Sequence, residues 1–209
     1  TLFRSLNGVY ERILRGAGCE ILDGRATLVD PHTVEVAGRR VSAEHILIAT
    51  GGWPSVPDLP GREHIMTSNE IFHLDRLPRH MVVVGGGYIA VEFAGILQGL
   101  GCEVTQLYRG KLFLRGFDDE IRAFLAEQMR HKGVDLRFDS DVTRIDRHGD
   151  ALRLSLNDGS HVDCDGVLYA TGRHPNSANL GLEACGVRHD GAGAIVVDDQ
   201  YRTNVPSIF

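Results

Sequence analysis

Short apolar stretches, separated by glycine, proline and charged residues, recur along the chain and predict many strands and few helices. Residues 1–16 are the first exception, because their apolar positions follow helical spacing. The stretches TLVD, HTVEVAG and ILIAT then alternate or run apolar, which is typical of the strands of an antiparallel meander. Residues 52–60 carry three prolines, so they predict a stiff linker rather than a helix or a central strand.

The middle of the chain has the pattern of a βαβ unit. A short helix is predicted from Ser68, with Ser68 or Asn69 as its cap. The apolar strand Met81–Val84 then leads through three glycines into the helical pattern VEFAGILQGL. A second strand is predicted over residues 103–108.

A second helix is predicted over residues 119–133. Acidic residues fill its first turn, and Gly133 provides the stop. The apolar residues Ile121, Leu125 and Met129 share one face of this helix. The alternating stretch VDLRF that follows predicts another strand.

A second meander precedes the end of the chain. The stretches DVTRI and ALRLSL predict a hairpin or meander with an Asn-Asp-Gly turn, and this meander ends in VLYATG at residues 167–172. That hexapeptide echoes the ILIATG about 120 positions earlier, which indicates two related nucleotide-binding units in tandem. The predicted fold class is α/β: a Rossmann-like three-layer ββα nucleotide-binding domain, with a parallel sheet and an antiparallel meander, flanked by pieces of a second domain of similar fold.

Composition and charge narrow the range of partners. The 209 residues are 43% hydrophobic and 24% charged, which describes an ordinary globular protein. A formal net charge of −6 without a block of basic residues argues against nucleic acid and anionic membranes as partners. The apolar runs end far short of the roughly 20 residues that a membrane span requires.

The four cysteines lie far apart and form no C-x-x-C pair, so neither a metal cluster nor a closely spaced redox pair is predicted. The nearest combination of soft ligands, His161 with Cys164, is more typical of a strand edge than of a metal site. Buried or incidental thiols in a reducing cytoplasm are the simpler interpretation, and we expect no metal.

A G-x-G-x-x-A pattern directly follows the strand 81–84, in the residues Gly85, Gly86, Gly87, Tyr88, Ile89 and Ala90. In such a turn Gly85 permits the tight bend, Gly87 lets the backbone approach a pyrophosphate, and Ala90 lets the helix pack on the strand. The alternative is a glycine-rich turn without a ligand. The context of strand, turn and helix favours a dinucleotide site.

The end of the next strand indicates which dinucleotide binds. NAD-binding domains place an acid there, about 20 residues beyond the turn, to hold the ribose hydroxyls. Here Tyr108 takes that place and is followed by Arg109 and Arg115. Arginine suits a phosphate because its planar donors match the phosphate oxygens. These residues predict NADPH as the ligand, the alternative being two solvated loop arginines.

Several segments together resemble the flavin-dependent disulfide reductases, and within them glutathione reductase and trypanothione reductase. The matching segments are HILIATGGWPSVPDLPG, VVVGGGYIAVEFAGIL, YRGKLFLRGFD, LYATGRHPN and YRTNVPSIF. Dihydrolipoamide dehydrogenase shares the architecture but typically has an acid at the position of Tyr108. The resemblance implies two cofactors, NADPH and FAD.

The resemblance also implies roles for single residues around NADPH. Tyr88 would be a lid over the nicotinamide pocket, Ile89 would line that pocket, and Gly172 would approach NADPH by its backbone. Glu92 would pair with a flavin-side lysine that this sequence does not contain. The alternatives are ordinary packing at a helix start for Tyr88 and a favourable first-turn acid for Glu92.

On the FAD side, the resemblance implies three segments: residues 1–52 as part of an FAD-binding domain, 53–174 as the NADPH-binding domain, and 175–209 as a return into the FAD-binding domain. The residues expected to touch FAD, or the seam between the two cofactors, are Ala26, Thr50, Gly51 and Arg173. The alternative is that both Ala-Thr-Gly elements merely turn the chain between domains.

The resemblance places the redox cysteine pair before residue 1, and the catalytic histidine and glutamate with the dimerisation domain after residue 209. No catalytic residue is therefore expected within this chain. The parent would be a cytoplasmic homodimer that reduces glutathione disulfide with NADPH through FAD and the cysteine pair. Two alternatives stay open: trypanothione reductase or another NADPH-dependent flavoprotein disulfide reductase, and an isolated dinucleotide-binding module without activity.

Overall fold

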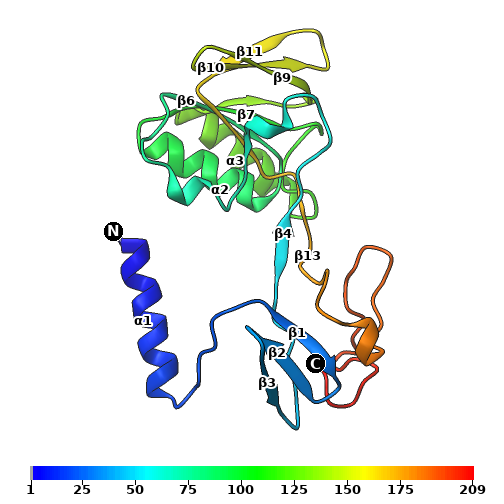
Figure 1. Cartoon of the computed structure of the whole chain (residues 1–209). Coiled ribbons are helices and arrows are strands. Elements are labelled where there is room, and N and C mark those ends of the chain that lie inside the picture. Colours follow the sequence, from blue (N-terminus) through cyan, green and yellow to red (C-terminus); the bar gives the residue numbers. More distant parts are fainter. Residues whose placement is uncertain (1) are drawn as a thin grey trace. The chain divides into compact units, whose positions relative to one another are not determined.

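A computed structural model describes residues 2–209, with side chains from residue 6 onward (Figure 1). The chain forms two compact units: residues 53–174 make up one, and the residues up to 52 together with 175–209 make up the other. The chain passes between them at strands β4 (Gly52–Pro54) and β13 (Arg173–Pro175), which pair as a two-stranded sheet. The assignment of the units to NADPH and FAD stays a prediction.

The unit of residues 53–174 is built around a five-stranded parallel sheet. Its strands lie in the order β5-β12-β6-β7-β8, and every pair of neighbours is parallel. Their bounds are β5 (Ile65–Met66), β6 (His80–Val84), β7 (Glu103–Leu107), β8 (Asp135–Arg137) and β12 (Gly166–Tyr169). Because both faces of such a sheet are covered, its central strand is a continuous apolar run rather than an alternating one.

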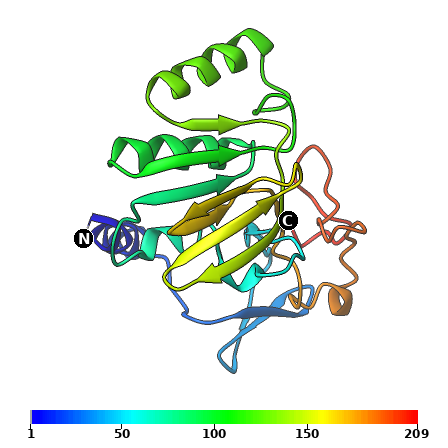
Figure 2. The ribbon, with the colours of Figure 1, turned by 90° about the horizontal axis from the view of Figure 1, so that it is seen from above.

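Two helices cover one face of this sheet, α2 (Tyr88–Gly99) and α3 (Asp119–His131) (Figure 2). Met81 and Val83 of β6 point to this side and share a buried cluster with residues of both helices. The start of α3 is fixed by Asp118, whose carboxylate accepts from the backbone amides of Glu120 and Ile121 at 3.1 and 3.0 Å. The acidic first turn is thus confirmed as a helix start.

A three-stranded antiparallel meander covers the opposite face of the sheet. It consists of β9 (Val142–His148), β10 (Ala151–Leu156) and β11 (His161–Cys164). Val82 and Val84 of β6 point to this side and pack with Leu154 of the meander, whose side chain is fully buried. The predicted α/β class, with a parallel sheet between helices and a meander, is confirmed.

The helices show two details that the sequence pattern did not give. Ile121 is 61% exposed, and the face of α3 that packs on the sheet contains Ala126 and Met129, with Leu125 half-buried. The apolar spacing on this helix is shared by a buried and an exposed stripe, and periodicity alone does not separate them. The helix expected from Ser68 is only a short 3₁₀ turn, η2 (Ile71–His73), which follows a similar turn, η1 (Arg62–His64).

The other unit contains α1 (Leu2–Gly16), an antiparallel sheet of β1 (Ala26–Asp30), β2 (Thr33–Val36) and β3 (Arg39–Ser42), and the 3₁₀ turn η3 (Glu183–Cys185). The predicted opening helix is confirmed. Its apolar side chains Leu6, Tyr10 and Ile13 are 46%, 65% and 59% exposed.

The third strand of the first meander is not ILIAT, as predicted, but Arg39–Ser42. The chain reverses at Ala37 and Gly38, whose φ angles of 49° and 79° are typical of a two-residue hairpin turn. The sequence interpretation missed this turn because it treated both residues as the end of the preceding strand. Within ILIAT, Ile46 forms only a parallel bridge to Ile208.

Candidate functional site

The glycine turn joins β6 to α2 at the carboxyl end of the parallel sheet. Gly85 has φ 143°, and a Cβ there would lie 2.4 Å from the Ala170 carbonyl oxygen, so only glycine fits. A Cβ on Gly87, the residue before α2, would meet no atom within 4 Å. Ala90 is fully buried where the helix packs on the strand. The turn is therefore tight behind Gly85 and open in front of Gly87.

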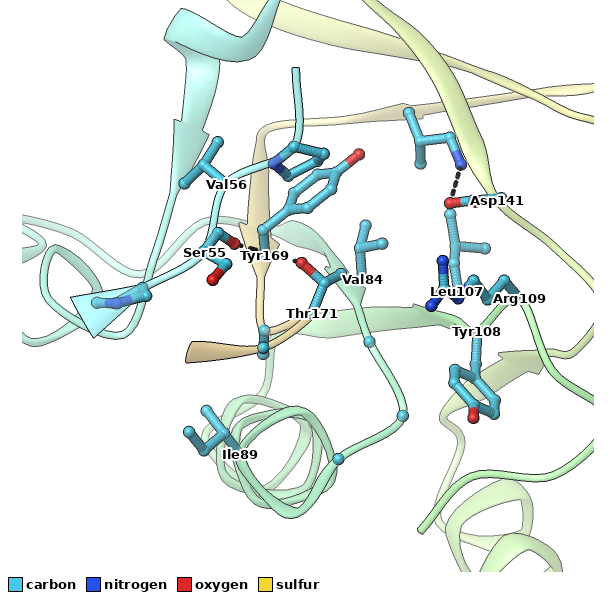
Figure 3. A pocket seen from close by; sticks show the side chains of 18 of the residues that line it. Ser55, Val56, Val84, Ile89, Leu107, Tyr108, Arg109, Asp141, Tyr169 and Thr171 are labelled. Atoms are coloured by element: carbon cyan, nitrogen blue, oxygen red, sulfur yellow. Dashed lines mark hydrogen bonds between the residues drawn. The ribbon is translucent and has the colours of Figure 1, made fainter. Parts of the chain in front are cut away.

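A cleft of about 1020 Å³ lies over this open side (Figure 3). Its walls come from the glycine turn and the first residues of α2, from the loop after β7, from the start of β9, from the end of β12 and from residues 54–59. These elements all belong to the unit of residues 53–174. Ligands of open α/β sheets bind outside the carboxyl ends of the strands, and this cleft has that position.

Arg109 and Arg115 both line the cleft and are exposed. Neither guanidinium has an ion-pair or hydrogen-bond partner among the residues that the structure describes. Figure 3 shows Arg109 on the opposite side of the cleft from Thr171. Two acids also line the cleft: Asp58 pairs with Arg62 at 3.2 Å, and Asp141 accepts from the Val142 amide at 3.0 Å. Arg109 and Arg115 are therefore available to an anionic ligand.

The loop that carries Arg115 is held in place by hydrogen bonds to helix α3 and to the glycine turn. Arg122 of α3 donates through Nε to the Phe113 carbonyl and through Nη2 to the Leu112 carbonyl, both at 2.7 Å. The Phe113 side chain is fully buried, and the Leu114 amide donates to the Gly86 carbonyl at 2.6 Å. These bonds fix the path of the loop relative to the glycine turn, so the position of Arg115 is largely set before any ligand binds.

Tyr108 does not replace the acid that NAD-binding domains have at this position. Its ring packs under the turn: a Cβ on Gly86 would lie 2.4 Å from two ring carbons, and one on Gly110 would lie 2.7 Å from a third. Figure 3 shows the ring directed away from Arg109. The residue therefore supports the glycine turn.

Of the three residues predicted to have roles at the start of α2, two line the cleft and one does not. Tyr88 lines the cleft and is 58% exposed, which leaves a lid room to move. Ile89 also lines the cleft and is half-buried. Glu92 is exposed and is not part of the cleft wall. Its predicted cofactor role stays an expectation without local support.

Of the residues predicted near the second Ala-Thr-Gly, Gly172 and Arg173 both line the cleft. Gly172 has φ 148°, and its carbonyl accepts from the Ser55 amide at 2.9 Å. The other residues predicted to touch FAD, Ala26, Thr50 and Gly51, belong to the other unit. Ala26 begins β1, while the Thr50 and Gly51 carbonyls accept from Asn176 at 3.2 and 3.0 Å.

Sequence reasoning missed two buried polar residues beside the cleft. Gln106 of β7 is 1% exposed; its Nε2 donates to the Gly85 carbonyl at 3.0 Å, while Oε1 has no partner in the described part of the chain. An unpaired buried acceptor costs about 1–3 kcal/mol. The Tyr169 hydroxyl is likewise unpartnered among described residues, and burial raises its pKa, so it stays neutral. The strand β7 reads EVTQL, with other polar residues beside Gln106, so the sequence pattern did not single it out.

The possible metal ligands and the cysteines among residues 2–209 form no cluster and no disulfide. No group of His, Cys, Asp or Glu there has the arrangement of a metal site, and none of its helices is both long and apolar enough to cross a bilayer. The four cysteines are unpaired. Burial raises the pKa of the Cys164 thiol to about 12, so it is protonated and a poor nucleophile at neutral pH.

A parallel sheet between helices and a meander, with a glycine turn at the carboxyl end of β6, defines a Rossmann-like nucleotide-binding fold. The chain belongs to the pyridine nucleotide-disulphide oxidoreductase family, whose sequence profile matches residues 1–209.

Several curated relatives carry more specific names. A glutathione reductase of Burkholderia cepacia is 46% identical over 204 residues, which are 98% of this chain and 45% of that protein. A chloroplastic/mitochondrial glutathione reductase of Pisum sativum is 43% identical over 98% of this chain and 37% of its own length. A trypanothione reductase of Trypanosoma congolense is 42% identical over 98% of this chain and 44% of its own. The chain thus spans less than half the length of these relatives.

Solved structures agree with this family. The HOCl-induced flavoprotein disulfide reductase RclA from Escherichia coli superposes with a TM-score of 0.85 at 33% sequence identity. The match covers 91% of this chain and 45% of that one. The resemblance to flavin-dependent disulfide reductases expected from the sequence is confirmed.

Proposed function

We propose that the unit of residues 53–174 binds NADPH, and that the chain is the NADPH-binding portion of a flavin-dependent disulfide reductase. In such an enzyme FAD accepts a hydride from NADPH and passes electrons on to a disulfide. This chain's share of the work is to bind the dinucleotide, select its 2′-phosphate and orient its nicotinamide.

One observation carries the NADPH proposal: two unpaired guanidinium groups share a cleft with an open helix N-terminus. The first amides of α2 and the positive end of the helix dipole suit a diphosphate. Because Gly87 has no side chain and the space in front of it is open, the diphosphate can approach the backbone closely. Arg109 and Arg115 suit a further phosphate on the adenosine ribose, where an acid would repel it.

The FAD proposal rests on four residues, Ala26, Thr50, Gly51 and Arg173. Gly51 has φ 67°, which is typical of a tight turn, and the Thr50 and Gly51 carbonyls accept hydrogen bonds from Asn176, so this turn has a defined backbone path. Ala26, at the start of β1, is exposed. Arg173 lies in the wall of the cleft proposed for NADPH, which suits a residue at the seam between the two cofactors.

For the complete protein we propose glutathione disulfide as the substrate, a homodimer as the assembly and the cytoplasm as the location. The glutathione reductases among the relatives support the substrate, and the trypanothione reductase at 42% identity supports trypanothione as the alternative. Oxidation of NADPH by the complete protein with each disulfide in turn separates the two. The alternative of a binding module without activity applies to the 209-residue chain by itself.

Titration of the 209-residue chain with NADPH and NADH tests the cofactor proposal. Each charge-assisted bond contributes about 1.5–3 kcal/mol, so each arginine should favour NADPH by roughly tenfold to a hundredfold. We expect NADPH to bind at least about tenfold more tightly, with a difference that shrinks as salt is added. Equal affinity for the two cofactors would contradict the proposal.

A further inference from the structure

Two carbonyl groups of the glycine turn are held from behind. The Gly85 carbonyl accepts from Nε2 of Gln106, at 3.0 Å, and the Gly86 carbonyl accepts from the Leu114 amide, at 2.6 Å. One donor is a side chain inside the sheet and the other is the backbone of the loop that carries Arg115. The turn is therefore anchored on two sides by elements that follow it in the chain.

These bonds also determine where the amides of the turn point. A trans peptide is planar, with its C=O and N–H on opposite sides, so holding the Gly85 carbonyl inward turns the Gly86 N–H outward. The bond to the Gly86 carbonyl does the same for the Gly87 N–H. Neither amide donates to a protein group among residues 2–209, and both residues line the cleft.

The choice of glutamine at this position is not explained by stability. Gln106 is 1% exposed, and its Oε1 finds no partner in the described part of the chain. The amide must keep this orientation, because the flipped one would set Oε1 against the Gly85 carbonyl oxygen. A leucine or methionine would fill the same space without an unpaired oxygen.

We propose that Gln106 is a positioning residue for the diphosphate of the bound dinucleotide: through the Gly85 carbonyl it aims the Gly86 amide into the cleft. This inference rests on the proposed function. It predicts a contribution that NADPH and NADH share, in contrast to the arginines, which act on the 2′-phosphate alone.

The variant Gln106→Leu tests this, with Gln106→Met as a second apolar side chain of similar length. Three probes are titrated: NADP⁺, NAD⁺ and adenosine 2′-monophosphate, which carries the 2′-phosphate but no diphosphate. We expect both variants to bind NADP⁺ and NAD⁺ about tenfold more weakly, as for the loss of one well-aimed bond to a charged group. Affinity for adenosine 2′-monophosphate should stay at the wild-type level.

The melting temperature Tm should change little, because the variants exchange one unpaired buried oxygen, Oε1, for another, the Gly85 carbonyl. The control is Gln98→Leu, since Gln98 also has an unpartnered buried Oε1 among described residues but lies at the far end of α2. It should bind all three probes like the wild type. Wild-type binding of NADP⁺ by both Gln106 variants, or an equal loss of adenosine 2′-monophosphate, overturns the inference. If the unaltered chain binds neither dinucleotide, the proposed function fails as well.

Discussion

Replacing Arg109 by glutamate should weaken NADPH binding by at least about tenfold and leave NADH binding unchanged or improved. The guanidinium is exposed, lines the cleft and has no partner among described residues, so its loss removes one or more charge-assisted bonds of about 1.5–3 kcal/mol each. The new carboxylate would repel the 2′-phosphate, and it would lie one residue after Tyr108, the position at which NAD-binding domains place the acid that holds the ribose hydroxyls. Fluorescence titration of both cofactors against both proteins measures the change.

Lys111→Glu is the matched control for this experiment. Lys111 is exposed on the same loop but is not part of the cleft wall, so the substitution makes the same change of charge without touching the site. NADPH affinity of Lys111→Glu should stay within a few-fold of the wild type, since screening weakens charges at a distance. The assignment of Arg109 would be wrong if Arg109→Glu bound NADPH as tightly as the wild type. It would also be wrong if the ratio of NADPH to NADH affinity were the same in Arg109→Glu and Lys111→Glu.

Gly86→Ala should weaken the binding of NADPH and of NADH to a similar extent. The added Cβ would lie 2.4 Å from two carbons of the Tyr108 ring, which is itself confined by Gly110. The ring or the turn must shift, at a cost of about 1–3 kcal/mol in the free energy of unfolding. Because the shift moves the amides that face the cleft, we expect NADPH and NADH affinities each to fall by about tenfold or more, as isothermal titration calorimetry would measure.

A second substitution should relieve this clash. Tyr108→Ala in the Gly86→Ala background removes the ring and should return part of the lost affinity, which general unfolding would not allow. Gly95→Ala is the control within α2, where a Cβ meets nothing within 4 Å. It should bind both cofactors normally and raise the free energy of unfolding by about 0.5–1 kcal/mol. Unchanged affinities in Gly86→Ala would show that the turn does not carry the dinucleotide.

The three-layer fold could be predicted from the sequence because its signals are local. The run Met81–Val84 is apolar throughout since both faces of β6 are covered, and Asp118 with Gly133 marks the limits of α3. The hairpin at Ala37 and Gly38 was missed because one of its two left-handed residues is an alanine, which rarely adopts φ above zero.

In the candidate site, too, some residues have a local sequence signal and others do not. The glycine turn and the arginines follow strand ends, and strand order alone places them at one edge of the sheet. Gln106 and Arg122 could not be predicted, since their partners are backbone carbonyls whose positions depend on the folded chain. Sequence periodicity likewise contains no information on which apolar stripe of α3 is covered, as the exposed Ile121 demonstrates.

Nitrogen-15 NMR of the labelled 209-residue chain tests the central claim most directly, by following the Gly86 and Gly87 amides together with the Nε of Arg109 and Arg115. NADP⁺ should shift all four signals, whereas NAD⁺ should shift the two glycine amides and leave the arginine Nε signals in place. Glycine amides that do not move at saturating NADP⁺, or arginine signals that respond equally to both ligands, would contradict a cleft built for a 2′-phosphorylated dinucleotide.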